Sequence, residues 1–257
     1  MEVQIKKAVR AGNSSAVILP RAWLDKEVRV ELAKKTRETM LAEVINILKS
    51  HIKLEEVIGI YLTGSYARGE EKEDSDIDIL VLTSSTDKEM ISEGIYNILI
   101  VSESLIRQKL NQDLFPIGQM IKEAKPLINL SYLDSIEVIV TKKNIKWYLD
   151  TTEEKLRLIK RIIDKARKAN KKSLDARVAY TLVLRIRTLY IIKRLIEKKD
   201  YHNRDFLKIL KNVSKGTGAY EGYLAVKNNL YEKNRISIED ISRLYGYLSS
   251  QLAGIKK

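Results

Sequence analysis

The chain has 257 residues, enough for one large domain or two smaller ones, and carries a net charge of +13. It contains no cysteine and only two histidines, which excludes disulfides and thiolate metal sites and leaves zinc without its usual ligands. No apolar run approaches the roughly 20 residues of a membrane helix, and the first residues lack the apolar segment of a signal peptide, so we expect a cytoplasmic protein without a membrane partner.

Residues 1–33 are predicted to form a small β domain. An alternating stretch at 3–5 precedes a turn signal at 11–14, a second strand is predicted at 16–19, and a third at 28–30. Pro20 ends the second strand and opens one helical turn. Because so short a segment buries little by itself, we expect it to pair with a second copy or to lean on the rest of the chain.

Residues 34–147 are predicted to form an α/β domain, a mixed sheet with flanking helices. Apolar residues at helical spacing predict a helix over 34–50, and another is predicted over 104–124. Largely continuous, β-branched apolar runs predict strands that are covered on both faces. These strands are placed at 57–62, 77–82 and 95–101, with a further strand at 136–140.

Residues 148–257 are predicted to form an all-α bundle, with a linker at 168–172. From residue 152 onward, apolar spacing marks helices over 156–166, 182–196, 205–212 and 237–253. Residues 150–257 hold 26 Lys and Arg against 12 Asp and Glu, a net charge of +14, and residues 1–149 carry −1. This asymmetry favours RNA or another polyanion as a partner of the bundle, although a solvated lysine-rich surface is the alternative.

One stretch, residues 64–78, contains the candidate phosphate-binding and metal-binding residues. Gly64 ends a predicted strand and allows a ligand to approach the backbone, and Ser65 adds a hydroxyl and an N–H for a phosphate. Asp76 and Asp78 lie two residues apart on a strand and therefore share one face. Carboxylates on an otherwise apolar strand are costly unless they bind cations, and Mg²⁺ takes oxygen ligands together with substrate phosphates. The alternative is an acidic surface turn beside an ordinary pair of aspartates.

The stretch resembles the DNA polymerase β superfamily of nucleotidyltransferases, in particular its minimal prokaryotic members, over about residues 38–147. The resemblance implies transfer of NMP from an NTP substrate to a hydroxyl, with two Mg²⁺ ions as cofactors. It implies that Gly64 and Ser65 bind the phosphates, that Asp76 and Asp78 are catalytic and bind the metal, and that Arg68 contacts phosphate unless it is a solvated turn residue. The matching residues are Gly64, Ser65, Gly69, Ser75, Asp76 and Asp78.

The resemblance also implies a third carboxylate on the next strand, as base and metal ligand. Asn97 stands at that position, and an amide neither carries charge nor accepts a proton as a base. Either Glu93, Glu103 or Glu137 takes its place, or catalysis is weakened or lost.

Residues 3–32 resemble the AbrB/MazE-type swapped-hairpin DNA-binding fold: a basic strand, Gly-Asn-Ser, an apolar strand, then Pro. This resemblance implies a homodimer in which Lys6, Lys7 and Arg10 contact DNA phosphates. The alternative is a dimerisation hairpin without DNA contact.

The bundle loosely resembles the C-terminal substrate domains of small nucleotidyltransferases. Related ribonuclease bundles carry an arginine, then four to six residues, then a histidine. Residues 195–197, which precede His202 at that spacing, contain no arginine, so we interpret His202 and His51 as ordinary surface or helix-end residues. A bundle of net +14 argues against a cationic drug as acceptor. The tyrosines of the bundle either stack bases or line a helical core; they are Tyr180, Tyr190, Tyr220 and Tyr223.

Two functional hypotheses follow. The first is an active nucleotidyltransferase that modifies a hydroxyl of RNA, tRNA or a protein. The second is a DNA-binding dimeric regulator or antitoxin whose transferase domain is degenerate and binds nucleotide.

Overall fold

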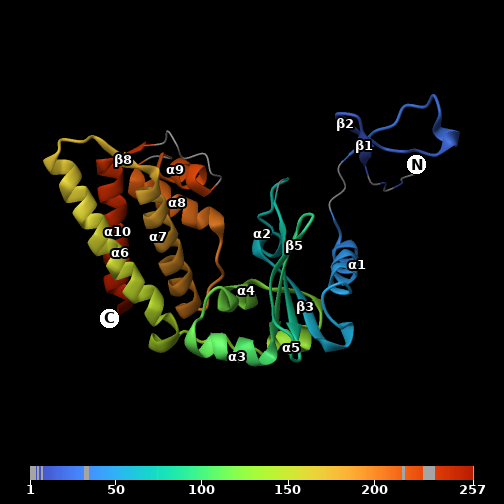
Figure 1. Ribbon diagram of the computed structural model, residues 1–257, viewed down its shortest axis with the longest axis horizontal. Helices are drawn as coiled ribbons and strands as arrows, with labels where there is room; N and C mark the ends of the chain where they lie inside the picture. The colour runs from blue at the N-terminus through green and yellow to red at the C-terminus, as the bar shows by residue number, and fades with distance from the viewer. Residues whose placement is uncertain are drawn as a thin grey trace.

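The computed structural model describes residues 4, 6, 8–31, 35–73, 75–215, 218–227 and 235–256. Figure 1 shows a small N-terminal hairpin, an α/β core and a C-terminal bundle of helices, with the core between the other two parts. These parts confirm the predicted fold class. Among the helices of the described residues, none combines the length and the hydrophobicity that crossing a membrane requires.

The N-terminal hairpin is short. Its strands β1 (Val9–Ala11) and β2 (Ser14–Ala16) pair antiparallel around a turn in which Gly12 has a φ of 60°. The 3-10 helix η1 (Arg21–Trp23) follows Pro20, as predicted. Every residue of the two strands is exposed, so the hairpin buries no core of its own.

Two strand predictions for this segment are wrong in part. The second strand ends at Ala16 instead of continuing to residue 19, and residues 28–30 form no strand. A strand needs a hydrogen-bonded neighbour, and a single copy of this segment offers none at these positions. Val3 and Ile5 of the predicted first strand lie outside the described residues.

A five-stranded mixed sheet forms the centre of the core, in the order β5-β6-β4-β3-β7. Strands β4 and β6 run parallel, and the other neighbours run antiparallel. The central strands are rich in branched aliphatic residues and are largely buried on both faces. The strands are β3 (Val57–Thr63), β4 (Ile77–Thr83), β5 (Lys88–Glu93), β6 (Tyr96–Ser102) and β7 (Lys125–Ile128).

Helices cover both faces of the sheet. One face packs against α1 through Met40, Val44 and Leu48. The other face packs against residues of α3, α4 and α5, and the five-residue helix α2 connects β3 with the segment that leads to β4. The helices are α1 (Arg37–Leu48), α2 (Gly64–Arg68), α3 (Glu103–Gln112), α4 (Ile117–Glu123) and α5 (Leu130–Asp134). The 3-10 helix η2 (Leu54–Glu56) lies directly before β3.

Two predictions for the core are wrong. The helix predicted over 104–124 is divided into α3 and α4, because Pro116 has no N–H to continue a helix from α3. Residues 136–140 form no strand; Ile136 and Val138 instead pack against the α3–α4 side of the sheet. The edge strand beside β3 is β7, a four-residue element containing a proline, which is too weak a signal to be recognised in the sequence.

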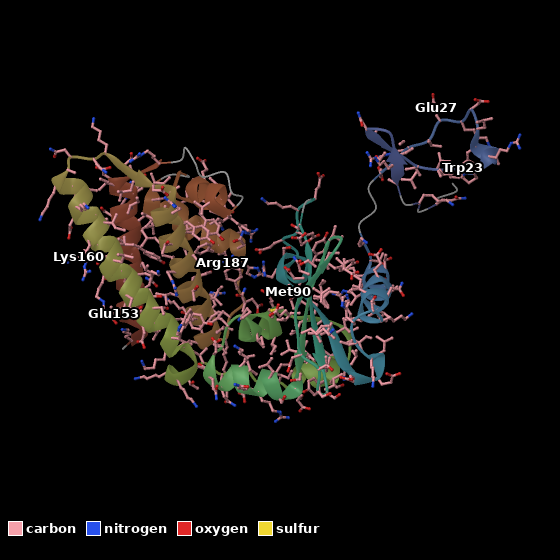
Figure 2. The ribbon with its side chains drawn as sticks, in the orientation of Figure 1. Trp23, Glu27, Met90, Glu153, Lys160 and Arg187 are labelled. Carbon is pink, nitrogen blue, oxygen red and sulfur yellow. The ribbon has the colours of Figure 1, made fainter. Side chains whose placement is uncertain are left out.

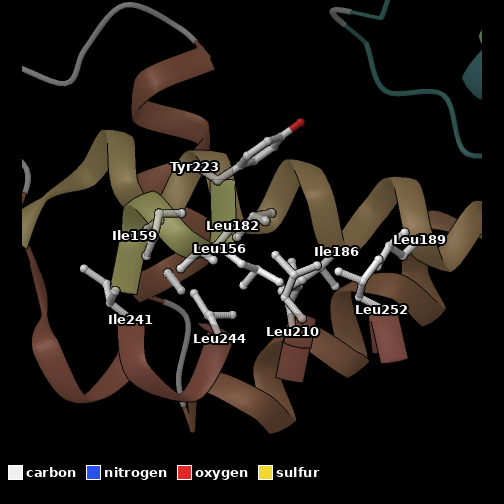
Figure 3. Close-up of a cluster of buried hydrophobic side chains, with 14 of the residues drawn as sticks. Leu156, Ile159, Leu182, Ile186, Leu189, Leu210, Tyr223, Ile241, Leu244 and Leu252 are labelled. Atoms are coloured by element: carbon white, nitrogen blue, oxygen red, sulfur yellow. The ribbon is translucent and has the colours of Figure 1, made fainter. Parts of the chain in front are cut away.

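The described part of the C-terminal region is helical apart from a small sheet of β8 and β9. Its first helix begins at Lys142, ten residues earlier than predicted, because Thr141 and Asn144 form a reciprocal capping box. Figure 3 shows leucines and isoleucines from several helices meeting in one hydrophobic cluster. The elements are α6 (Lys142–Lys168), β8 (Ser173–Asp175), α7 (Ala176–Ile196), α8 (Asn203–Ser214), α9 (Gly218–Lys227), β9 (Arg235–Ser237) and α10 (Ile238–Lys256).

Candidate active site

The end of β3 brings Gly64 and Ser65 to one edge of the sheet. Gly64 has a φ of 66°, and a Cβ at this position would lie 2.1 Å from Oδ2 of Asp78. Glycine is therefore required both by the backbone conformation and by the close approach of the carboxylate. Ser65 follows at the start of α2 and is half-buried. Gly64 and Asp78, which are far apart in sequence, thus lie together at the edge of the sheet where the resemblance predicts phosphate binding.

Asp78 is the second residue of β4 and pairs in register with Thr63 of β3 and Asn97 of β6. Asp76 precedes the strand and is exposed. Burial raises the pKa of the Asp78 carboxyl above its ordinary value, and the negative charges of Asp76 and Glu123 raise it further, while a hydrogen bond from Asn97 opposes them. A cation close to Asp78 would restore its ionised form.

Asn97 lies directly beside Asp78, where the resemblance predicts the third carboxylate. Its Oδ1 accepts a hydrogen bond from the hydroxyl of Ser92 at 2.8 Å, and its side chain also hydrogen-bonds Asp78. The amide therefore supports the Asp78 carboxylate with a neutral partner and adds no third negative charge to this edge.

The three acids considered as substitutes lie elsewhere. Glu93 sits opposite Tyr96 in the sheet, on the face covered by α1, and its Oε1 lies 2.9 Å from Nε2 of His51. Glu103 begins α3 beyond the far end of β6, where it pairs with an arginine of its own helix. Glu137 is exposed between α5 and α6. The charged groups that act on Asp78 include none of the three.

Glu123, the last residue of α4, is a carboxylate that the sequence reasoning missed. Its Oε1 accepts a hydrogen bond from the Gly64 N–H at 2.9 Å, and its Oε2 accepts one from Nη1 of Arg68 at 2.6 Å. Its side chain is only 10% exposed. An acidic residue at the end of a short helix is ordinary on solvated faces, so the sequence offers no signal that would single it out. In this structure, the Glu123 carboxylate accepts the hydrogen bond of the Gly64 N–H, where the resemblance predicts a phosphate.

Arg68 is the centre of an ion-pair cluster. Its guanidinium lies 3.0 Å from Glu70 and 2.6 Å from Glu123, and its side chain is 11% exposed. Burial alone would lower the pKa of Arg68, but the charges and hydrogen bonds of these two carboxylates outweigh it and raise the pKa. Glu70 also accepts the N–H of Asn203 at 2.9 Å, and Arg68 lies over the ring of Tyr201 at 5.3 Å, so the cluster joins the core to the bundle. The prediction that Arg68 contacts phosphate stays a prediction.

A cleft of about 230 Å³ opens between α2 and α4 of the core and the end of α7 with the segment before α8. Cationic side chains outnumber carboxylates in its lining, which favours an anionic occupant. The charged lining residues are Arg68, Lys122, Glu123, Lys125, Arg194, Lys199 and Asp200, and His202 also lines the cleft.

The predicted DNA-binding residues lie far from this edge, in the N-terminal segment. Lys6 is exposed, and Lys7 lies outside the described residues. Arg10 is an exposed residue of β1 and donates from Nε to the carbonyl of Gly12 at 3.2 Å. Figure 1 shows the hairpin beyond the N-terminal end of α1, on the far side of the core from the bundle.

The tyrosines of the bundle pack mainly against one another. The rings of Tyr180 and Tyr223 stack at 5.3 Å, and those of Tyr220 and Tyr223 at 6.0 Å. Tyr190 contacts the rings of Tyr201 and Phe206. This packing favours the interpretation of a tyrosine-lined helical core over that of free stacking platforms.

The donor set at the edge fits a hard cation. Asp76 and Asp78 offer carboxylate oxygens, which Mg²⁺ prefers, and the pKa of Asp78, raised by burial and then by the neighbouring negative charges, would be lowered by a bound cation. Within the described ranges, no group of three or more His, Cys, Asp and Glu side chains is arranged to hold a metal. Mg²⁺ characteristically takes further ligands from substrate phosphates.

Comparisons with known proteins agree with the fold. The model of the nucleotidyltransferase domain family matches residues 41–208, which include the sheet, both aspartates and the first part of the bundle. A search of curated proteins finds no match.

Several solved structures resemble the chain. A nucleotidyltransferase-like protein from Exiguobacterium sibiricum has 13% identity and a TM-score of 0.37, with 84% of this chain and 75% of that chain covered. The spectinomycin adenyltransferase AAD(9) from Enterococcus faecialis, solved with ATP and spectinomycin, has 15% identity and a TM-score of 0.40, covering 82% and 99%. A toxin-antitoxin structure with AMP-PNP has 20% identity and a TM-score of 0.26, covering 47% and 96%.

Proposed function

Because the chain belongs to the nucleotidyltransferase domain family, we propose that it transfers the NMP of an NTP to a hydroxyl of an RNA or protein acceptor at the edge formed by Gly64, Ser65, Asp76 and Asp78. The acceptor oxygen attacks the α-phosphorus, the bond to the β-phosphate breaks, and pyrophosphate leaves. The observation that carries the proposal is the close approach of the Gly64 backbone to the Asp78 carboxylate. It places the proposed phosphate-binding turn directly beside the proposed metal-binding aspartates.

Asp76 and Asp78 are the residues that would hold Mg²⁺, two ions on the family's pattern. When bound, the metal neutralises phosphate charge and polarises the reacting oxygens. The hydrogen bond from Asn97 favours the ionised form of Asp78 but does not outweigh burial, and Asn97 takes no proton. The proton of the acceptor hydroxyl therefore passes to the aspartate pair or to water.

Gly64 and Ser65 bind the β- and γ-phosphates in this proposal. The Gly64 N–H now donates to Glu123, so an arriving phosphate oxygen replaces the Glu123 carboxylate at this amide. Arg68 keeps Glu70 as a partner when Glu123 moves away. Glu123 thus holds the phosphate-binding turn in place before the nucleotide binds.

The acceptor is expected to be anionic. The excess of positive charge lies in residues 150–257, and the cleft between core and bundle is lined by more cations than carboxylates. Positive potential at the mouth of a site raises the local concentration of polyanions and disfavours cationic acceptors.

Pyrophosphate release from labelled NTPs with Mg²⁺ tests the proposal. The wild-type protein, supplied with RNA and protein acceptors, should release pyrophosphate, and Asp76→Ala/Asp78→Ala should release at least about 1,000-fold less, because it removes the groups that hold the metal. Equal release by the two proteins, with each acceptor supplied, would refute the enzymatic proposal.

A second candidate function is specific DNA binding by a homodimer, as in an autoregulator or antitoxin. The observation that favours it is the exposure of large apolar side chains in the N-terminal segment, where Ile18 is 71%, Leu24 72% and Val30 68% exposed. Side chains of this kind are normally covered, and a second copy of the segment is the proposed cover. Lys6, Lys7 and Arg10 would then face DNA phosphates.

Titration of duplex DNA at several salt concentrations tests this candidate. Binding should weaken steeply with salt, and Lys6→Ala/Lys7→Ala/Arg10→Ala should reduce the salt dependence because phosphate contacts are lost. Leu24→Glu should convert a dimer into a monomer in sedimentation. A triple variant that binds DNA like the wild type removes the proposed DNA surface.

A further inference from the structure

Two arginines lie against the ring of Tyr201, one from each part of the molecule. The guanidinium of Arg68, from the core, is 5.3 Å from the ring centroid, and that of Arg187, from α7 of the bundle, is 5.6 Å from it. Tyr201 itself is only 7% exposed. The junction between the two parts therefore holds two positive charges close together in a partly buried place.

The two arginines differ in their partners. Arg68 is paired with the carboxylates of Glu70 and Glu123. Arg187 donates from Nε to the hydroxyl of Tyr201 at 3.1 Å and also hydrogen-bonds the hydroxyl of Tyr223. In the part of the chain that the structure describes, no carboxylate forms an ion pair with Arg187.

A partly buried guanidinium without a counter-charge is costly. Removing a cation from water costs several kcal/mol unless an anion compensates it, and tyrosine hydroxyls supply dipoles but no charge. Burial acts to lower the pKa of Arg187, although its contacts with Tyr201 and Tyr223 outweigh burial and raise it, and burial raises the pKa of Tyr201, so this hydroxyl stays neutral. The cost is repaid if an anionic ligand binds.

The position of Arg187 fits such a ligand. Figure 2 shows Arg187 on the side of the bundle that faces the core. Figure 3 shows Tyr223 at the border of the hydrophobic cluster, with its hydroxyl pointing away from the other labelled side chains. Across Tyr201 lies Arg68, whose partner Glu123 reaches the Gly64 amide. Arg187 is thus connected through three side chains to the phosphate-binding turn.

We propose that Arg187, together with the hydroxyls of Tyr201 and Tyr223, is an anion-binding site that receives a phosphate group entering between the core and the bundle. The proposal rests on the proposed function for the origin of that phosphate, which is either the nucleotide or the acceptor. Guanidinium has five N–H donors in a planar fork that matches a phosphate, and the tyrosine hydroxyls can donate their own protons to it.

Thermal unfolding with and without pyrophosphate tests the site independently of catalysis. Pyrophosphate should raise the Tm of the wild type by about 3 °C at concentrations well above its Kd, and this rise should be clearly smaller in Arg187→Met. Without pyrophosphate, Arg187→Met should unfold at about the same temperature as the wild type, since Arg187 has no carboxylate partner that its removal would leave buried and unpaired. Arg187→Lys should keep part of the pyrophosphate effect.

Arg185→Met is the matched control. Arg185 lies two residues earlier on α7, over the ring of Trp147 at 5.8 Å, and donates to Thr151 at 3.0 Å. Its removal changes the charge of the bundle equally but should leave the pyrophosphate effect intact. A loss of the effect in both variants would show that overall charge, and no local site, binds the anion, which overturns the proposal.

Two further results would overturn it. One is a pyrophosphate effect in Arg187→Met equal to that of the wild type. The other is an Arg187→Met protein that is unfolded or clearly less stable without anion, because Arg187 would then be a structural strut between its tyrosines.

The source of the phosphate is identified by two binding titrations, one with a non-hydrolysable NTP analogue and Mg²⁺ and one with a short single-stranded RNA. Arg187→Met should weaken one of them by about 10-fold or more, as expected for a charge-assisted contact. Unchanged affinity in both arms refutes the site. Asp76→Ala/Asp78→Ala should retain the pyrophosphate effect, so a failure of the enzymatic proposal remains distinguishable from a failure of this one.

Discussion

Asp78 in the core and Arg187 in the bundle are charged side chains of opposite sign, and neither has an ion-pair partner among the described residues. Between them lies Arg68, which is fully paired with Glu70 and Glu123. The difference between the ion-paired Arg68 and the other two residues separates charges that stabilise the fold from charges available to a ligand. A pair that is complete in the protein contributes to structure, whereas a partly buried charge with neutral partners is stabilised when its counter-ion binds. A cation for Asp78 and a phosphate for Arg187 are the two components of a metal–nucleotide complex.

The largest expected effect separates the paired arginine from the unpaired one. Arg68→Met leaves Glu70 and Glu123 without their cation in a place where both are mostly buried, so we expect the free energy of unfolding to fall by about 3–5 kcal/mol. Urea unfolding measures it. Arg187→Met should show no such loss. Equal destabilisation by the two changes would contradict the distinction between the ion-paired Arg68 and Arg187, which has no ion pair.

Arg107→Met is the control for this prediction. Arg107 also pairs with a carboxylate at 2.6 Å, that of Glu103, but its side chain is 75% exposed. Solvent screens such a pair, so its loss should change the free energy of unfolding by no more than about 0.5 kcal/mol.

The second effect tests how closely the core is built around Asp78. Gly64→Ala introduces a Cβ that would lie 2.1 Å from Oδ2 of Asp78, so either the turn or the carboxylate must shift. A displacement of this size should lower the rate of pyrophosphate release by about 100-fold. Initial rates at saturating NTP measure it.

Gly69→Ala separates backbone strain from the clash. Gly69 has the same φ of 66°, but a Cβ there meets nothing within 4 Å. It should cost about 1 kcal/mol of stability and leave the rate of release nearly unchanged. If the two alanine variants lose activity equally, the contact between Gly64 and Asp78 has no catalytic importance.

The sequence predicts Asp78 as a site residue but gives no comparable prediction for Arg187. Gly64, Ser65 and the Asp-x-Asp pattern are local in sequence, and the strands that carry them are long apolar runs, so the sheet edge is predictable. The charge split predicts an anionic partner but no particular residue. Arg187 is one of many basic residues on the bundle, and its lack of a carboxylate is a property of the packed structure.

Glu123 was missed for the same reason. Its two contacts, to Gly64 and Arg68, join residues more than 50 positions apart, and no local pattern encodes them. The β7 strand and the division between α3 and α4 depend likewise on tertiary pairing and on one proline.

The smallest effect concerns Asp78 itself. Its folded pKa is raised by burial and by Asp76, so its ionised form is disfavoured in the fold. The resulting cost is absent below the ordinary pKa of an aspartate, grows as the pH rises toward the raised pKa, and is constant above it.

Without Mg²⁺ at neutral pH, Asp78→Asn should therefore raise the free energy of unfolding slightly, by no more than about 1 kcal/mol. Asp76→Asn, at an exposed position, should give a smaller change. The gain from Asp78→Asn should vanish at acidic pH, where wild-type Asp78 is protonated as well. Asp78→Asn should also lose the stabilisation that Mg²⁺ gives the wild type. If it instead destabilises the metal-free protein at neutral pH, Asp78 is compensated within the fold, and the parallel with Arg187 fails.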